Sequence, residues 1–121
     1  MSKTLEWDRE GTQAFEINFG KNLSGGVELT GTPTILLEQR TALYPTETWT
    51  DRTSEVTISA GTIVDGTDAN GTTVTNGAVQ FTLTLDPDSE PEPSDDYRIN
   101  LKVDRDDGRD EVSKTLLNIR P

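Results

Sequence analysis

The sequence predicts an all-β protein, a single domain folded as a sandwich of seven or eight antiparallel strands. Three observations predict this fold. Large apolar residues alternate with polar ones in twos along most of the chain, which is the period of a half-buried strand. Turn-forming dipeptides such as Asn70-Gly71 separate these runs at short intervals. The 121 residues suffice for one core, and a hydrophobic fraction of 31% suits a thin sandwich in which alternate residues face inward.

The alternating runs locate the strands in order along the chain. The run that begins at Val79 is the clearest, and the run from Tyr97 is the next. Threonine is abundant between the inward positions, which fits exposed strand faces. The residues that mark the predicted strands are Phe15, Ile17 and Phe19; Val27 and Leu29; Ile35 and Leu37, after a break at Gly31-Thr32-Pro33; Val56 and Ile58, with Ile63 and Val64 close behind; Val79, Phe81, Leu83 and Leu85; Tyr97, Ile99, Leu101 and Val103; and Leu117 and Ile119.

Turns and loops are predicted between these runs. Residues 41–53 carry two aromatic residues without a strand period, and residues 86–96 hold three Pro and six carboxylates that should stay solvated and extended. We therefore expect both segments to be loops. The expected turns are Ser24-Gly25-Gly26, Asp65-Gly66, Asn70-Gly71, Asn76-Gly77 and Asp107-Gly108.

Composition excludes several function classes. The chain has no Cys and no His, so it lacks disulfides, thiolate ligands, and Ser-His-Asp or Cys-His catalysis. A net charge of −11 and a pI near 4.2 disfavour nucleic acid as a partner. The start lacks the apolar segment of a signal peptide, and no apolar run approaches the ~20 residues that span a bilayer. We expect synthesis in the cytoplasm, no membrane contact, no cofactor and no catalytic residues; an enzyme that uses paired carboxylates is the least favoured alternative.

The charged stretch from Asp104 to Glu111 could hold calcium or form a turn. An EF-hand-like frame with Gly108 at its sixth position places Val103 at the first and Lys114 at the twelfth, and neither residue is a suitable ligand. We therefore expect no metal site in this stretch. The composition favours a solvated turn between two strands.

The strand pattern selects the length of that turn. A two-residue loop at Asp107-Gly108 would place Lys114 opposite Leu101 on the inner face. A three-residue loop over residues 106–108, with Gly108 in the left-handed conformation, instead pairs Ile99 with Thr115 and Tyr97 with Leu117. The three-residue loop is the prediction, because it keeps charge out of the core.

Aromatic residues suggest where a partner could bind. Trp7 and Tyr97 fall on strand-like segments and are expected in the core. Tyr44 and Trp49 lie in the predicted loop at 41–53, which either folds back over an open end of the sandwich or exposes an aromatic surface. An exposed pair would suit a carbohydrate-binding or adhesive module, which is the second function class that the sequence allows.

Three stretches carry a resemblance to a known family. EWDREGTQAFEINFGKNL, GVELTGTPTILLEQ and DYRINLKVDRDDGRDEVSKTLLNIR resemble the small immunoglobulin-like proteins encoded among the structural genes of tailed bacteriophages and prophages. Both predicted loops are longer than that family leads one to expect. The resemblance implies an immunoglobulin-like sandwich without enzymatic activity, located in the virion on the head surface or in the head-to-tail region. The implied partners are capsid or connector proteins, and further copies of the chain are also candidates.

The N-terminal segment is the first candidate for docking. Residues 1–10 include Leu5 and Trp7, and a terminal strand of this kind can pair with the sheet edge of a neighbour. The alternative is an ordinary edge strand of the chain's own sandwich. The complete set of candidate partner-binding residues is therefore Leu5, Trp7, Tyr44 and Trp49.

Overall fold

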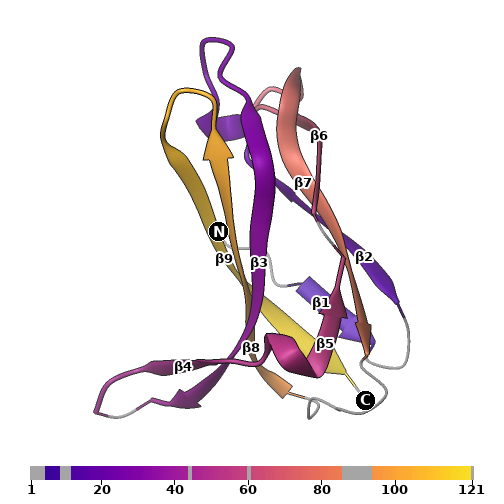
Figure 1. Ribbon diagram of the computed structural model, residues 1–121, viewed down its shortest axis with the longest axis vertical. Helices are drawn as coiled ribbons and strands as arrows, with labels where there is room; N and C mark the ends of the chain where they lie inside the picture. The colour runs from indigo at the N-terminus through magenta and orange to yellow at the C-terminus, as the bar shows by residue number, and fades with distance from the viewer. Residues whose placement is uncertain (1–4, 9–11, 44, 60, 86–93, 121) are drawn as a thin grey trace.

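Two β-sheets packed face to face make up the protein, as the sequence predicts (Figure 1). The computed structural model describes residues 5–8, 12–43, 45–59, 61–85 and 94–120. Within these ranges the chain forms nine strands and two short 3-10 turns, η1 (Gly20–Asn22) and η2 (Thr53–Glu55), and no α-helix. Nine strands are one more than the upper end of the prediction. The described part of the chain contains no helix with the length and apolar character needed to cross a membrane.

The larger sheet has five strands in the order β1-β9-β8-β3-β4. Its strands are β1 (Leu5–Asp8), β3 (Leu29–Ala42), β4 (Thr48–Asp51), β8 (Ser94–Arg105) and β9 (Asp110–Arg120). β1 runs parallel to β9, and the other neighbours are antiparallel. β1 and β4 are therefore the two opposite edges of this sheet.

The smaller sheet is built around β7 (Thr73–Leu85). β2 (Gln13–Asn18) pairs with β7 antiparallel. β5 (Val56–Ile58) and β6 (Thr62–Thr67) pair with successive stretches of β7. The runs marked by Val56 and by Ile63 are thus two separate strands, which accounts for part of the higher strand count.

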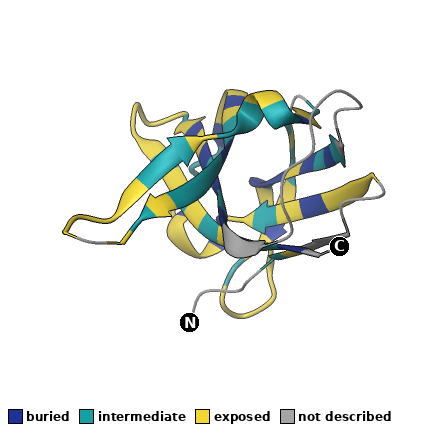
Figure 2. Ribbon diagram, turned by 90° about the horizontal axis from the view of Figure 1, so that it is seen from below, coloured by how far each residue is buried: buried dark blue, intermediate teal, exposed yellow. Residues whose placement is uncertain are grey.

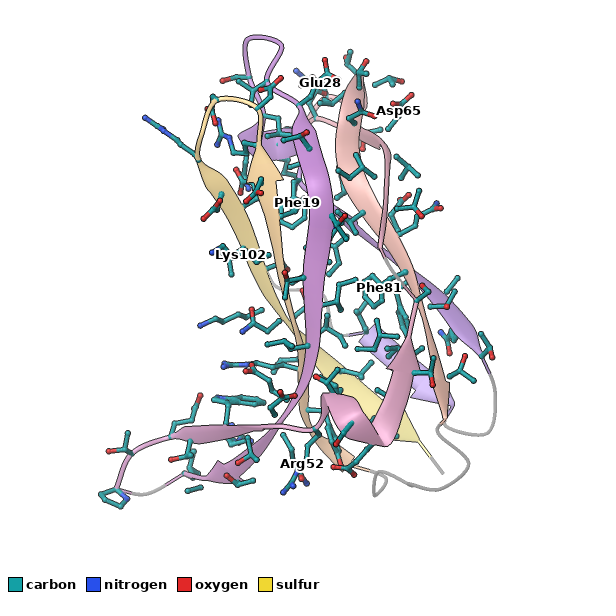
Figure 3. The ribbon with its side chains drawn as sticks, viewed as in Figure 1. Phe19, Glu28, Arg52, Asp65, Phe81 and Lys102 are labelled. Carbon is teal, nitrogen blue, oxygen red and sulfur yellow. The ribbon has the colours of Figure 1, made fainter. Side chains whose placement is uncertain are left out.

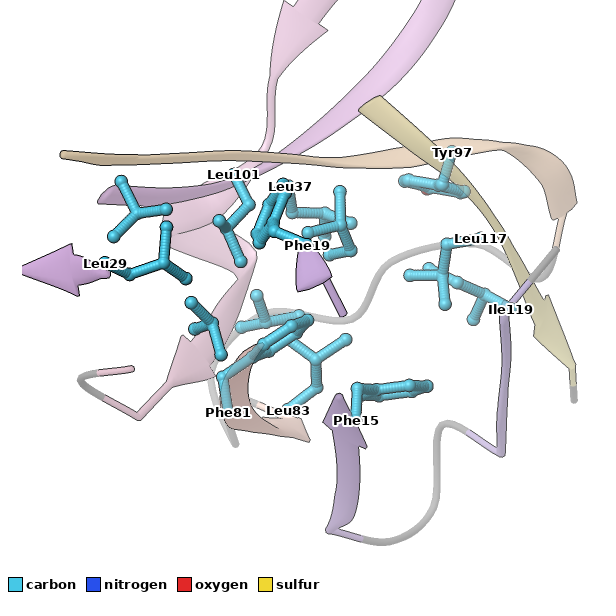
Figure 4. Packing of buried hydrophobic residues seen from close by; sticks show 14 of the residues in the cluster. Phe15, Phe19, Leu29, Leu37, Phe81, Leu83, Tyr97, Leu101, Leu117 and Ile119 are labelled. Carbon is cyan, nitrogen blue, oxygen red and sulfur yellow. The ribbon is translucent and has the colours of Figure 1, made fainter. Parts of the chain in front are cut away.

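The core lies between the sheets and follows the predicted alternation. Phe15, Phe81 and Leu83 of the smaller sheet face Leu37, Tyr97 and Leu117 of the larger one (Figure 4). Tyr97 is 1% exposed, which confirms its expected place in the core. The side chain of Trp7, the other aromatic residue expected there, lies outside the described set. The buried hydrophobic residues are Phe15, Phe19, Leu23, Leu29, Leu37, Val56, Ala78, Val79, Phe81, Leu83, Tyr97, Ile99, Leu101, Val103, Leu117 and Ile119.

One strand, β3, replaces the two that were predicted around Leu29 and Leu37. The expected break at Gly31-Thr32-Pro33 is a β-bulge, because the pairing with β8 shifts register between Thr30 and Thr34. Gly31 has a φ of +77°, a conformation that glycine adopts without the usual steric cost. The prediction that two separate strands are divided here was wrong, because a bulge uses the same residue types as a turn.

Two other predicted turns also lie within strands. Asp65-Gly66 is part of β6 and Asn76-Gly77 is part of β7. The pairs Val64–Ala78 and Gly66–Val74 leave one residue of β6 opposite three residues of β7, so these dipeptides form a bulge. The reversal between the strands occurs at the Asn70-Gly71 turn, as predicted, where Asp68 N–H donates to Thr72 O at 2.9 Å.

The hairpin between β8 and β9 has the predicted register. Ile99 pairs with Thr115 and Tyr97 pairs with Leu117. Arg105 N–H donates to Arg109 O at 2.8 Å, which closes a loop of three residues, and Gly108 has a φ of +88°. The three-residue loop is confirmed.

The two predicted loops have different outcomes. Residues 41–53 do not form a loop, because β3 continues to Ala42 and β4 pairs back onto it as a hairpin. In the second segment, residues 86–93 lie outside the described residues, while residues 94–96 already belong to β8. The strand period missed β4 because it is only four residues long.

Candidate partner-binding site

The hairpin formed by the end of β3 and by β4 projects from the body of the sandwich. It leaves the larger sheet on the side away from β7 and β2 (Figure 1). Every described residue from Glu38 to Glu55 is exposed or partly exposed, and Figure 2 shows the projecting hairpin without buried residues. The hairpin is therefore held by its own pairing and by contacts at its base.

Trp49 lies near the base of this hairpin and is partly buried. The guanidinium carbon of Arg98 is 4.0 Å from the centroid of the Trp49 ring, and that of Arg40 is 5.8 Å away. Trp49 Nε1 donates a hydrogen bond to the side chain of Glu47. Both guanidinium groups lie within the distance at which a cation is attracted to the face of an indole. The indole is thus held by contacts with three neighbouring side chains.

An ion pair fixes the nearer of the two guanidinium groups. Arg98 Nε donates to Glu38 Oε1 at 2.7 Å, and the side chains are only 16% and 14% exposed. The two residues face each other on β8 and β3, so the strand register brings them together. This pair is therefore more shielded from water than the exposed pairs that contribute about 0–1 kcal/mol.

Hydrogen bonds at the start of η2 anchor the hairpin to the sheet. Asp51 Oδ1 accepts from the backbone N–H of Thr53 at 2.9 Å and from its hydroxyl at 2.6 Å. The same hydroxyl oxygen accepts from Leu37 N–H at 3.0 Å, and Arg52 N–H donates to Leu37 O at 2.7 Å. The hydrogen bond from the Thr53 side chain, with that from its backbone, lowers the pKa of Asp51, and slight burial opposes the shift.

Among the candidate residues that the structure describes, those on β1 do not come together with Trp49 on β4. Leu5 is partly buried in β1, pairs with Leu117 and packs against the core. The backbone of Trp7 pairs with Ile119 in the same strand, and Tyr44 lies outside the described residues. Since β1 and β4 are opposite edges of the larger sheet, Leu5 and Trp49 belong to different surfaces. The backbone of Leu5–Asp8 forms the edge strand that was the alternative to a docking arm.

Sequence reasoning missed Arg98, Glu38 and Arg40. Arg98 lies between the inward-facing residues Tyr97 and Ile99, while Glu38 and Arg40 lie in a polar stretch, and both settings ordinarily indicate only a solvated strand face. The signal that could have found Arg98 and Glu38 is the strand pairing, because opposite charges face each other once β3 and β8 are aligned. The sequence alone does not identify that pairing.

The other described polar clusters are weaker candidates for a binding site than the cluster around Trp49. At the tip of the β8–β9 hairpin, Arg105 bridges Asp107 at 2.7 Å and Glu111 at 2.9 Å. Partial desolvation would raise the pKa of Asp107, but hydrogen bonds from Arg109 and Arg105 and their positive charges outweigh it and lower that pKa. Within the described ranges, no group of three or more carboxylates is arranged to hold a metal ion.

Two of the open clefts on the described surface lie along the sides of the sandwich. One, of about 440 Å³, runs between β3 and β5 and is lined by Pro33, Ile35, Thr53, Val56, Thr57, Ile58, Ser59 and Gly61. The other, of about 470 Å³, is lined by Leu5, Glu16, Ile17, Asn18, Lys21, Ser113 and Thr115. The second cleft holds a carboxylate, Glu16, and an amine, Lys21, but both clefts are open to solvent.

Comparisons with known proteins identify no relative of this chain. No protein-family model matches the chain, and neither a curated protein nor a solved structure matches it significantly.

Proposed function

We propose that this protein is a structural component of a bacteriophage virion, one that attaches to the particle through protein–protein contacts and turns over no substrate. The resemblance of three sequence stretches to phage immunoglobulin-like proteins motivates the proposal. Capsid or connector proteins are the proposed partners, and the head surface or neck is the proposed location.

An immunoglobulin-like topology is part of the proposal, and the strand order supports it. An immunoglobulin sandwich of the variable type packs a sheet extended at one edge against a smaller sheet. Here β9, β8, β3 and β4 are neighbours in one sheet, while β2, β7 and β5 are neighbours in the other. Tyr97, buried near the start of β8, has the position of the tyrosine that marks the corresponding strand of many such domains.

The main structural support for attachment is the indole of Trp49, which lies on a projecting hairpin and is held by neighbouring side chains. Trp and Arg are the residues most enriched at the energetic centres of protein interfaces, and a side chain that is already ordered loses little entropy on binding. Trp49, with Arg98 at 4.0 Å and Arg40 at 5.8 Å, has both features. The projection of the hairpin makes this cluster accessible to a large partner.

The geometry of the same indole disfavours the carbohydrate-binding alternative. A sugar ring stacks on an open aromatic face, and Arg98 at close range leaves less open aromatic surface on Trp49 for such stacking. A protein partner can instead pack around the edge of the ring and pair with the arginines.

The test is incorporation into virions purified from the phage or prophage that encodes the chain. The native protein should be found in stoichiometric amounts in the particles, and Trp49→Ala should reduce its incorporation at least tenfold without unfolding it. Thr82→Ala, on the outer face of the smaller sheet, is the matched control and should be incorporated normally. Absence of the native protein from purified particles would overturn the proposal, as would specific glycan binding that Trp49→Ala abolishes.

A further inference from the structure

A larger surface, which begins at the base of the hairpin with Glu38 and Arg98, covers the outer face of the larger sheet. We use "outer face" for the side chains that β3, β8 and β9 direct away from the smaller sheet. Lys102 points outward in this way, whereas Phe81 and Phe19 point between the sheets (Figure 3). Strand register arranges the middle of the outer face as three rows: Thr34, Lys102 and Val112; Leu36, Asn100 and Lys114; and Glu38, Arg98 and Leu116.

This face carries exposed apolar side chains. Val112 is 51% exposed and Leu116 is 43% exposed, and both are on β9 with Lys114 between them. Among the described residues they are two of three large hydrophobic side chains with such exposure, and the third, Leu43, follows β3 in the hairpin. Leu36 adds a partly buried apolar side chain in the middle row. Apolar residues gathered on one sheet face indicate a contact surface.

The charge of the outer face is balanced, although the whole chain carries −11. The described cations that the strands direct to the outer face are Arg40, Arg98, Lys102 and Lys114. The described carboxylates on the same side, with β4 included, are Glu38, Asp51, Asp104 and Asp110. Lys102 and Asp110 already pair at 3.4 Å, as Arg98 and Glu38 do at 2.7 Å. Two strongly acidic copies repel each other over most of their surfaces, but not through a face where the charges cancel.

The opposite side of the sandwich provides a comparison within the same molecule. The outer face of the smaller sheet includes Thr57, Thr62, Gln80 and Thr82, with Glu16 as the charged residue of its central rows. It is also nearly neutral, yet it lacks exposed large apolar residues among those described. Balanced charge is therefore common to the outer faces of both sheets. The outer face of the larger sheet differs in that it also exposes Val112 and Leu116.

The area of the outer face suits a second copy of the chain. β3, β8 and β9 have 14, 12 and 11 residues. With strands about 4.8 Å apart and a rise of about 3.3 Å per residue, three such strands present roughly 500 Å². Two copies would bury roughly 1,000 Å² in total, near the lower limit for specific interfaces, and the projecting hairpins would add to that area.

From these observations we infer that the outer face of the larger sheet is a homodimer interface, in which the same face of two copies meets around a two-fold axis. This inference goes beyond the attachment function, because it concerns a different partner and depends on Val112 and Leu116 of β9, although Glu38 and Arg98 border both surfaces. We expect a dissociation constant in the micromolar range, typical of a weak, reversible dimer. Asn100, at the centre of the three rows, lies close to its own copy across the axis.

The test measures purified protein alone, so its result does not depend on attachment to a virion. Sedimentation velocity between about 1 and 300 µM should show a reversible monomer–dimer equilibrium, since this range brackets a micromolar Kd. The double variant Val112→Glu/Leu116→Glu should weaken dimerisation at least tenfold. The matched control Thr82→Glu/Thr84→Glu adds the same charge to the other sheet and should leave the dimer unchanged.

A cross-linking measurement keeps the inference testable if the double variant does not fold. The chain has no Cys, so Asn100→Cys introduces a single thiol that should form a disulfide-linked dimer under mild oxidation, whereas Thr82→Cys should stay monomeric. A wild-type protein that remains monomeric at the highest concentration would overturn the inference. It would also be overturned by equal cross-linking of the two Cys variants, or by undiminished dimerisation of Val112→Glu/Leu116→Glu.

Discussion

The guanidinium of Arg98 lies 4.0 Å from the centre of the Trp49 ring while its Nε donates to Glu38 at 2.7 Å. The carboxylate holds the guanidinium from one direction and the indole covers it from another. This relationship joins three strands, since Arg98 is on β8, Glu38 on β3 and Trp49 on β4. It gives the projecting hairpin a defined orientation at its base.

The contact between Arg98 and Trp49 should contribute measurably to stability. A double-mutant cycle with Arg98→Leu and Trp49→Leu should give a coupling energy of about 1 kcal/mol, because the contact is partly shielded from water. Urea denaturation of the wild type, the two single variants and the double variant measures it. Additive effects within about 0.3 kcal/mol would mean that the ring and the cation do not interact.

The carboxylate of Asp51 should stabilise the base of the hairpin in a pH-dependent way. Asp51→Ala removes two hydrogen bonds from Thr53 and should lower the free energy of unfolding by about 1 kcal/mol at neutral pH. The pKa of Asp51 is lowered in the folded state, so the unfolded state binds its proton more readily. The stabilisation is therefore complete above an unfolded pKa of about 3.9 and is lost as the pH falls through the folded value.

Urea denaturation of the wild type and Asp51→Ala, at neutral pH and again below about pH 3, checks this dependence. The difference between the two proteins should shrink at the acidic pH. A difference that is unchanged there would show that the charge of Asp51 does not contribute.

Gly66 should be intolerant of a side chain. An ideal Cβ at Gly66 would lie 2.9 Å from the backbone carbon and oxygen of Gly77, and it would lie closer still to Oδ1 of Asn18. That oxygen is not free to move, since it accepts from Gly20 N–H at 3.0 Å and from Thr67 N–H at 3.1 Å. Gly66→Ala should therefore cost about 1–3 kcal/mol, the usual range for overpacking.

Gly71→Ala is the matched control for that variant in thermal and urea denaturation. Gly71 has open space around it and a φ of +80°. Because alanine is disfavoured at such a φ, Gly71→Ala should lower the free energy of unfolding by about 1 kcal/mol. A smaller loss for Gly66→Ala than for Gly71→Ala would contradict the crowding at the bulge.

The N-terminal strand should behave as part of the sandwich. Leu5 packs against the core and pairs with Leu117, so Leu5→Ala should lower the free energy of unfolding by about 1 kcal/mol, less than a fully buried Leu because Leu5 is partly exposed. Urea denaturation measures this loss. Unchanged stability, combined with reduced incorporation into virions, would instead identify Leu5 as a docking residue.

The sequence by itself determined the features that depend on local alternation and on hairpin closure. The inward positions of β7 and β8 follow from a period of two, because a strand directs successive side chains to opposite faces. The three-residue loop at Asp106–Gly108 also follows, since a register shifted by one residue would have moved Lys114 toward the core. Tyr97 was placed correctly for the same reason.

Only the tertiary structure decided which glycines end a strand and which side chains meet. Gly31, Gly66 and Gly77 occupy bulges, whereas Gly71 and Gly108 lie in turns. Gly31, Gly71 and Gly108 have a positive φ and Gly66 and Gly77 have close backbone neighbours, so the same residue type serves different needs that the sequence does not separate. The cluster of Trp49, Arg98 and Glu38 depends on the alignment of β4, β3 and β8, and residues 38 and 98 are far apart along the chain. Pairing between distant strands is governed by the packing of the whole core, which no local pattern of residues encodes.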